Sequence, residues 1–187
     1  KRLMKHNLGL DSDKTIIGYV GRISREKNIE LLINAFERLP EQHRVQLVLV
    51  GDGPEDQVKH CHELKNCLVT GFVSNVQDYL RAMDIFVMPS LTETTSLATL
   101  EAMSCGLPVL TTRVGFIKSY VVKGYNGLFI PRNNPSTLAL KIEQLRNDRQ
   151  LRETLGRNAR KTVAYSFSWE RSINRIKRLL LKKYYGE

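Results

Sequence analysis

The sequence predicts an α/β fold, a doubly wound parallel sheet of about six strands with helices on both faces. Apolar runs rich in strand-forming residues alternate with stretches of helical period, at intervals of roughly 20–30 residues. The runs are apolar throughout, which is typical of parallel strands that are buried on both faces. Gly and Pro separate the segments and mark the turns. These observations favour one open sheet joined by crossover helices.

The elements follow one another in regular alternation. Residues 1–13 are polar and basic and are expected to be the exit of a linker. Strands are expected at residues 15–20, 45–50, 68–70, 84–89, 109–112 and 128–130. Helices are expected after Lys27 to about residue 39, at about 54–64, 76–83, 96–105, 135–147 and 149–164, and from Ser168 onwards.

The order of the strands predicts where a ligand would bind. If the order is 3-2-1-4-5-6, the first and fourth strands are neighbours at the point where the winding reverses. The loop after the first strand carries Arg22 and Lys27, and the loop after the fourth carries Glu93. Both loops then open into one crevice at the carboxyl edge of the sheet, where open α/β sheets bind ligands. This convergence predicts a nucleotide site.

Two carboxylates, Glu93 and Glu101, lie eight residues apart in the loop after the fourth strand and in the next helix. Thr95 or Ser96 is expected to cap that helix, whose first turn offers N–H groups and a partial positive charge to a phosphate. Carboxylates instead accept hydrogen bonds from sugar hydroxyls. A structural interpretation stays open, because Ser90 and Glu93 also fit a capping box.

Arg22 and Lys27 together could clamp a diphosphate. Arginine offers a planar, forked set of donors, and lysine offers a mobile point charge. Either cation alone is more often a solvated surface residue, so the hypothesis depends on the nearby anion seat.

Length and composition favour one domain. The chain has 187 residues, of which 42% are hydrophobic, enough for a sizeable core. It begins with Lys rather than Met and is therefore expected to be a piece of a longer protein. No apolar run is long enough to predict a membrane span, and no signal peptide is visible. A cytoplasmic location is expected.

The net charge is +10 and is concentrated near the C-terminus. Residues 141–187 hold 13 Lys or Arg against 5 Asp or Glu, a net +8. Three interpretations stay open: a solvated helical face, which is the default, contact with an anionic membrane or phosphate, and nucleic-acid binding. The last is the weakest because no nucleic-acid motif accompanies the charge, so no nucleic-acid partner is expected.

The cysteines predict free thiols and no metal centre. Cys61, Cys67 and Cys105 are odd in number and lack the spacing of a disulfide framework, which favours a reducing compartment. His60 and His62 flank Cys61, but on a helix they point to nearly opposite sides and meet no zinc spacing.

The stretch around the two carboxylates resembles the Glu-x7-Glu signature of retaining glycosyltransferases with the GT-B fold, the family 4 type (glycosyl transferases group 1). The segment from Gly21 to Lys27 resembles the family's Gly-Arg…Glu-Lys segment, and the resemblance covers residues from about 8 to 185. Further matches are Gly51-Asp52-Gly53-Pro54, Pro89-Ser90, Glu101-Ala102-Met103, Cys105-Gly106 and Pro108-Val109.

The resemblance implies the C-terminal half of a GT-B fold, which is Rossmann-like. Residues 1–187 would form the domain that binds a nucleoside-diphosphate sugar, with a helical extension at about 135–187. The N-terminal domain that holds the acceptor is absent from this chain and would be its partner. No cofactor and no metal are implied.

The resemblance also implies roles for individual residues. Glu93 would contact the donor sugar, Glu101 the ribose, and Arg22 and Lys27 the diphosphate; Glu93, Arg22 and Lys27 are the expected catalytic residues. The expected donor-binding residues are Gly21, Arg22, Lys27, Phe72, Val73, Glu93, Thr94, Thr95, Ser96, Leu97 and Glu101. Backbone groups near Phe72 and Val73 would meet the nucleobase, although ordinary core packing is an equal alternative there.

The sequence departs from the family pattern at three places. Thr94-Thr95-Ser96 replaces Gly-aromatic-Gly, so that side chains crowd the approach to the phosphate seat. Phe116, Lys118 and Ser119 replace Gly, Pro and Glu, and Asn28 replaces a common Gly. The identity of the donor sugar and of the acceptor therefore stays open.

The expected function is transfer of a sugar, with retained configuration, to a glycan or lipid-linked acceptor, as in polysaccharide or glycolipid biosynthesis. The chain alone is expected to bind nucleotide but to transfer little. One alternative is a non-catalytic nucleotide-binding or regulatory module of the same fold. A less favoured alternative is a basic α/β domain that binds nucleic acid.

The last helix has an apolar stripe opposite a basic face. Spacings of four, three, four and four residues join Trp169, Ile173, Ile176, Leu180 and Tyr184. In GT-B proteins the last helix crosses back to the partner domain. Packing on this domain or on a partner domain is expected, and a helix lying on a membrane surface is the alternative.

Overall fold

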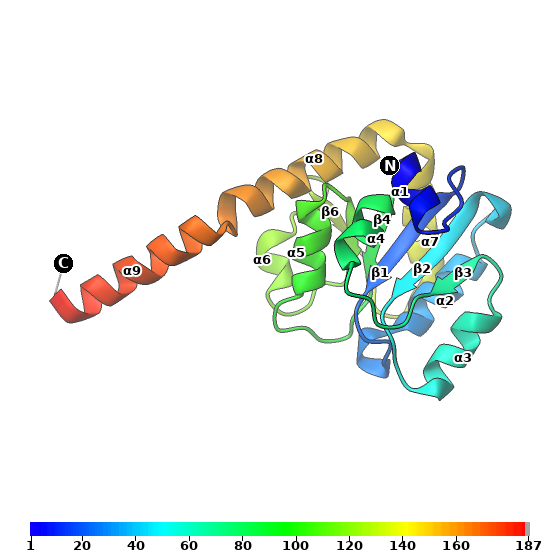
Figure 1. Cartoon of the computed structure of the whole chain (residues 1–187), viewed down its shortest axis with the longest axis horizontal. Helices are drawn as coiled ribbons and strands as arrows, with labels where there is room; N and C mark the ends of the chain where they lie inside the picture. The colour runs from blue at the N-terminus through cyan, green and yellow to red at the C-terminus, as the bar shows by residue number, and fades with distance from the viewer. Residues whose placement is uncertain (186–187) are drawn as a thin grey trace.

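A computed structural model describes residues 1–185 and contains the six-stranded parallel sheet that the sequence predicts (Figure 1). The strands are β1 (Thr15–Val20), β2 (Val45–Val50), β3 (Cys67–Val69), β4 (Ile85–Met88), β5 (Val109–Thr111) and β6 (Gly127–Phe129). Their order in the sheet is β3-β2-β1-β4-β5-β6, which confirms the doubly wound arrangement.

Helices cover both faces of the sheet. They are α1 (Arg2–Asn7), α2 (Ile29–Glu37), α3 (Glu55–Glu63), α4 (Val76–Ala82), α5 (Leu97–Ser104), α6 (Ile117–Tyr120), α7 (Pro135–Asn147), α8 (Arg149–Ser166) and α9 (Trp169–Tyr185), with short 3₁₀ helices at Arg25–Lys27 and Gln42–Arg44. α2 packs against α7, whereas α4 lies between α1 and α5, and α5 packs on α8. The expected long helices are all present, with ends displaced by one or two residues.

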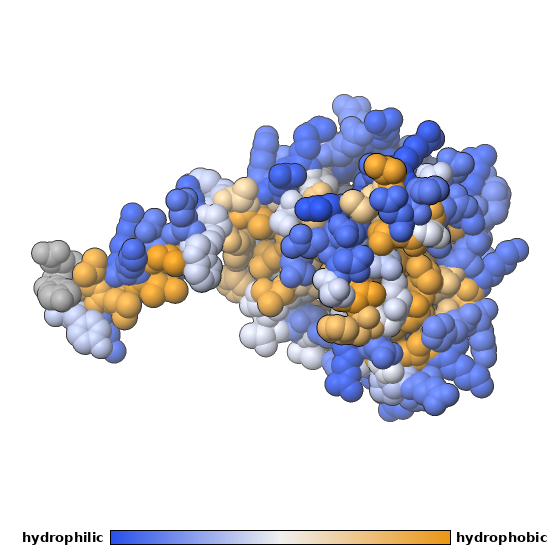
Figure 2. All heavy atoms as spheres, viewed as in Figure 1, coloured by the Kyte–Doolittle hydropathy of each residue, from blue (hydrophilic) through white to orange (hydrophobic). Residues whose placement is uncertain are grey.

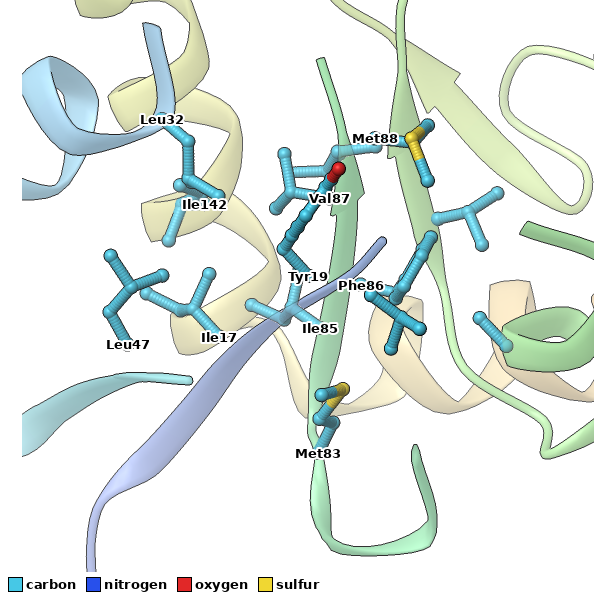
Figure 3. Close-up of a cluster of buried hydrophobic side chains, with 14 of the residues drawn as sticks. Ile17, Tyr19, Leu32, Leu47, Met83, Ile85, Phe86, Val87, Met88 and Ile142 are labelled. Atoms are coloured by element: carbon cyan, nitrogen blue, oxygen red, sulfur yellow. The ribbon is translucent and has the colours of Figure 1, made fainter. Parts of the chain in front are cut away.

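The core lies between β1, β4 and the helices on either side (Figure 3). Side chains from both faces of the two central strands are fully buried, which explains why these strands are apolar throughout. Gly18 of β1 is required by this packing, because a Cβ atom there would lie 2.0 Å from the sulfur of Met83. The hydroxyl of Tyr19 donates to the carbonyl oxygen of Arg22 at 2.7 Å, so the core also holds the loop after β1.

The N-terminal residues are more ordered than the sequence predicts. Residues 2–7, expected to be part of a linker, form α1 and pack on α4. Lys5 is 5% exposed, and its Nζ lies 2.8 Å from Asp84 Oδ2 and donates to the carbonyl oxygen of Lys14 at 2.7 Å. A lysine is normally expected on the protein surface, and its partner Asp84 lies 79 positions away, so this ion pair could not be predicted from the sequence.

Helix α9 extends away from the body of the domain (Figure 1). Its apolar stripe is largely exposed, with Trp169 at 79%, Ile176 at 56% and Tyr184 at 73%. Figure 2 shows exposed hydrophobic side chains on the part of this helix that projects from the domain. The prediction that the stripe packs on this domain is therefore wrong. Packing on a partner domain or on another apolar surface stays a prediction. Within residues 1–185, no helix combines the length and the apolar character needed to cross a bilayer.

Replacing Lys5 with Ala is expected to lower the free energy of unfolding by about 3 kcal/mol at neutral pH, because Asp84 stays buried without its closest cation. Arg2→Ala is the matched control, since Arg2 pairs with Asp13 at 3.7 Å on the exposed surface. Urea unfolding measures both, and equal losses would contradict a stabilising role for the buried pair.

The same pair predicts a dependence of stability on pH. Burial raises the pKa of Asp84, but the charge of Lys1, the N–H of Ile16 and the Lys5 ammonium outweigh it and hold that pKa below its usual value. A carboxylate with a lowered folded pKa adds stability above its unfolded pKa of roughly 3.9, and this contribution is lost as the pH falls through the folded pKa. The stability difference between the wild-type chain and Lys5→Ala should therefore shrink toward acid pH.

Candidate functional site

The loops after β1 and β4 meet at the carboxyl edge of the sheet, as the strand order predicts. β1 pairs with β4, and the N–H of Leu91 donates to the carbonyl oxygen of Glu26 at 2.8 Å. The side-chain amide of Asn28 donates to Pro89 O at 3.2 Å and to Arg132 O at 2.9 Å, which joins three loops. Asn28 has φ of +55°, a left-handed conformation that asparagine tolerates well, so Asn can stand where the family commonly has Gly.

Lys27 and Glu93 form an ion pair at the centre of this edge. Lys27 Nζ lies 2.7 Å from Glu93 Oε1, and Ser90 Oγ donates to the same oxygen at 2.8 Å. The side chains are 24% and 9% exposed, respectively. The structure thus brings together the expected cation of one loop and the expected carboxylate of the other.

Arg22 lies in a pocket with the predicted nucleobase residues. The pocket has a volume of about 310 Å³, and its lining includes Gly21, Arg22, Phe72 and Val73. The Phe72 side chain is 91% exposed, so it is a surface residue and not the core residue of the alternative interpretation. An exposed aromatic ring beside backbone of Gly21 suits contact with a flat ring system.

Glu101 lines an adjoining pocket and is exposed. This pocket has a volume of about 330 Å³ and includes residues 74–78 together with Glu101. Val76 lines both pockets, so the pocket of Arg22 and the pocket of Glu101 are neighbours. Glu93 is not among the lining residues of either pocket, and its carboxylate is held by Lys27 and Ser90 instead.

The loop from Thr94 to Ser96 leads into α5. Ser96 is the cap, because its Oγ accepts a hydrogen bond from the N–H of Thr99 at 3.3 Å; Thr95, the other predicted cap, makes no such bond. Thr94, Thr95 and Leu97 are exposed, so their side chains can face a ligand. The first turn of α5 therefore presents its N–H groups and positive dipole end at this edge.

The segment after β5 is hydrogen-bonded to this loop, a contact that no sequence pattern predicted. Phe116 N–H donates to Thr94 O at 2.9 Å, and Thr112 Oγ1 donates to Ser90 O at 2.5 Å. Gly115 approaches the loop so closely that a Cβ atom there would lie 1.7 Å from Glu93 O. Gly115, with φ of +49°, was the available signal, since a glycine in a loop often marks a left-handed backbone or a close approach.

Tyr120 of α6 supports the cap residue. Its hydroxyl donates to Ser96 O at 3.3 Å, and its ring packs edge-on against Phe167 with the ring centroids 5.6 Å apart. Burial raises the pKa of Tyr120 to about 12, so the hydroxyl keeps its proton and remains a donor.

Other features of the described residues carry no clear ligand chemistry. Within residues 1–185, no group of three or more His, Cys, Asp or Glu side chains is placed to hold a metal ion. A further pocket of about 470 Å³ lies beside the loop after β1, where Arg25 and His60 alternate with Glu30 and Asp56. Its mixed charges indicate no single class of ligand.

Comparison with known sequences identifies relatives of this chain. The sequence model of the family described as Glycosyl transferases group 1 matches residues 1–162. The capsular polysaccharide biosynthesis glycosyltransferase CapM of Staphylococcus aureus is 34% identical over 170 residues, which cover 85% of this chain and 45% of CapM. The chain thus spans about half the length of the curated relatives that it matches.

Solved structures share the same fold. A sucrose-phosphate synthase from Thermosynechococcus elongatus aligns with a TM-score of 0.87 and 29% identity, covering 98% of this chain and 49% of the synthase. HepE of Anabaena in complex with UDP-glucose aligns with a TM-score of 0.87 and 26% identity, covering 95% of this chain and 51% of HepE. These likenesses confirm that the fold is the Rossmann-like half of a GT-B glycosyltransferase.

Gly115→Ala is expected to lower the free energy of unfolding by about 3 kcal/mol, because the new methyl group meets Glu93 O and the backbone is left-handed. Gly124→Ala is the control, since Gly124 has φ of +77° but open space around it, so only the backbone cost of about 1–2 kcal/mol applies. Denaturant unfolding compares the two. Losses of equal size would show that the close approach to Glu93 is not a constraint.

Proposed function

Since the chain belongs to the glycosyl transferases group 1 family, we propose that it is the donor-binding domain of a retaining glycosyltransferase of the family 4 type. It binds a nucleoside-diphosphate sugar and supplies the sugar to an acceptor held by an N-terminal domain of a longer protein. The observation that carries the proposal is the meeting of Lys27 and Glu93, from two loops far apart in sequence, at the reversal point of the sheet.

The geometry supports an arrangement of the donor across the carboxyl edge. The nucleobase occupies the pocket of Gly21, Phe72 and Val73, and the ribose reaches Glu101 through the adjoining pocket that shares Val76. Hydroxyls of the ribose donate to the Glu101 carboxylate, which would repel phosphate.

The diphosphate runs from the edge of the nucleobase pocket, whose lining includes Arg22, toward Lys27 and the sugar. Arg22 and Lys27, with the N–H groups at the start of α5, bind the diphosphate. Lys27 contacts Glu93, so the cation for the phosphate and the carboxylate for the sugar are neighbours. Thr94 and Thr95 form the wall beside the sugar in place of the glycine and the aromatic residue of the family pattern, and this difference sets which sugar fits.

The chemical step breaks the bond between the anomeric carbon and the diphosphate oxygen. Negative charge grows on the leaving diphosphate, and Arg22, Lys27 and the α5 dipole stabilise it. Each cation contributes about 2–4 kcal/mol to the transition state, the scale of one oxyanion-hole donor. Two cations supply the charge that a metal ion would otherwise provide, so the step needs no metal or cofactor. The acceptor hydroxyl attacks from the side that the diphosphate leaves, which retains the configuration, and its proton passes to the leaving diphosphate oxygen.

Uridine is the first base to test. Structures of HepE, which is 26% identical to this chain, hold UDP and UDP-glucose. CapM acts in capsular polysaccharide biosynthesis, which supports a glycan or lipid-linked acceptor. Since the acceptor site lies on the N-terminal domain, this chain alone binds the donor but transfers little.

The exposed face of α9 docks on that N-terminal domain. Its apolar stripe, with Trp169 and Ile176 more than half exposed, is unpaired within residues 1–185, and the chain spans about half the length of its relatives. Contact with an anionic membrane on the cytoplasmic side is the second candidate, favoured by basic residues along the polar face of the helix. These are Arg171, Arg175, Arg178 and Lys182.

Calorimetric titration of this chain with UDP, GDP and ADP is expected to show binding of one diphosphate. Glu101→Ala should weaken that binding about tenfold, because a carboxylate that accepts hydrogen bonds from the ribose is lost. Glu37→Ala, at the exposed end of α2, is the matched control and should bind like the wild-type chain. If none of the three diphosphates binds to the chain or to the longer protein, the nucleotide site is wrong.

Lys27→Ala in the longer protein is expected to lower kcat by about 10²- to 10³-fold, the effect of losing one transition-state donor. The free energy of unfolding should also fall, because Glu93 is 9% exposed and loses its cation while it keeps the bond from Ser90, so kcat is compared under conditions in which both enzymes are folded. Lys59→Ala on α3 is a control of equal charge change and should retain the rate. A Lys27→Ala enzyme with a nearly intact rate would exclude Lys27 from the step.

A further inference from the structure

Ser90 is a fully buried residue of the candidate site to which the family resemblance gives no role. It is 0% exposed, and its Oγ lies 2.8 Å from Glu93 Oε1. Its carbonyl oxygen accepts a hydrogen bond from Thr112 Oγ1, so β5 fixes the backbone of Ser90. The residue is therefore held rigidly beside the carboxylate.

The contact between Ser90 and Glu93 is not a helix cap. In a capping box, the serine oxygen would accept from the N–H of the residue three positions later, and a helix would begin there. Here the hydroxyl meets the carboxylate of Glu93, and the next helix begins at Leu97. The pattern Ser-Leu-Thr-Glu therefore forms a contact between a hydroxyl and a carboxylate, not the capping box that its spacing predicts.

The single proton of the Ser90 hydroxyl has two neighbouring acceptors. Met88 Sδ lies 3.2 Å away, and Glu93 Oε1 lies 2.8 Å away. A carboxylate oxygen is a much stronger acceptor than a thioether sulfur, so the proton is directed to Glu93.

Both hydrogen bonds to the carboxylate end on the same oxygen. Lys27 Nζ and Ser90 Oγ each contact Oε1, which fixes the rotation of the carboxylate and leaves Oε2 to meet a ligand. Lys27 is the mobile partner, because its long side chain also serves the diphosphate in the proposed function. Ser90, short and buried, is the partner that stays in place when a ligand draws Lys27 away.

We propose that Ser90 is a positioning residue for Glu93, which it holds through Oε1 so that Oε2 accepts a hydrogen bond from a hydroxyl of the donor sugar. This inference rests on the proposed function, in which Glu93 contacts the sugar. It assigns Ser90 to recognition of the sugar and not of the nucleotide, so its loss should change the preference for a diphosphate sugar over the plain diphosphate.

The experiment compares two affinities in each variant by calorimetry. The first probe is whichever of UDP, GDP and ADP binds the wild-type chain, and the second is the glucose or N-acetylglucosamine conjugate of that diphosphate, whichever binds more tightly. Ser90→Ala is expected to lower the preference for the conjugate about 5- to 10-fold while affinity for the plain diphosphate stays within about twofold. Glu93→Gln should lower the same preference at least as much.

Thr111→Val is the matched control. Thr111 is also 0% exposed and its hydroxyl donates to Thr112 O at 3.1 Å, but the hydroxyl does not contact Glu93. It should lose stability like Ser90→Ala and keep the preference for the conjugate. Thermal unfolding of both variants checks that their losses of stability are similar.

The possible outcomes separate the two proposals. An unchanged preference in Ser90→Ala with a lowered preference in Glu93→Gln overturns the role of Ser90 and leaves the proposed function standing. An unchanged preference in both variants overturns the assignment of Glu93 to the sugar, and with it the role of Ser90. Equal weakening of both probes in Ser90→Ala would show a general structural role and would overturn the positioning role.

Discussion

The parallel pairing of β1 with β4 is the constraint on which the candidate site depends. It joins Ile17 to Ile85 and Gly18 to Phe86, at the point where the winding of the sheet reverses. The helices that follow β1 and β4 pack in different groups, α2 with α7 and α5 with α4 and α8, so the two loops separate at the reversal point and open into one crevice. The ion pair between Lys27 and Glu93 joins these two loops.

The segment after β5 converts this meeting of loops into a fixed geometry. Thr112 and Phe116 hold the loop after β4 by hydrogen bonds, and Tyr120 reaches the cap of α5. The Tyr120 ring in turn packs against Phe167, which follows α8 and comes two residues before α9 begins. The loop after β4 and the start of α9 are therefore connected through the buried Tyr120 and the partly buried Phe167.

Sequence patterns predicted the strands and their order, because apolar runs and glycine turns report directly on burial and backbone conformation. They also predicted that the loops carrying Arg22, Lys27 and Glu93 meet, since loops after parallel strands share one edge. The buried pair of Lys5 and Asp84 and the support from Tyr120 could not be predicted. They depend on contacts between residues far apart in sequence, and neither a lysine nor a tyrosine carries a local signal of burial.

The departures from the family pattern differ in whether they strain the backbone. Within residues 1–185, non-glycine residues with positive φ include neither Thr94 nor Ser96, so these positions do not require glycine and the replacement strains no backbone. What changes is the side-chain volume at the start of α5, where Thr94 and Thr95 are exposed. Gly115, by contrast, is kept where φ is positive and Glu93 O leaves no space for a Cβ atom. The glycine that is kept is the one the fold needs, and the residues that vary lie where the backbone imposes no such requirement.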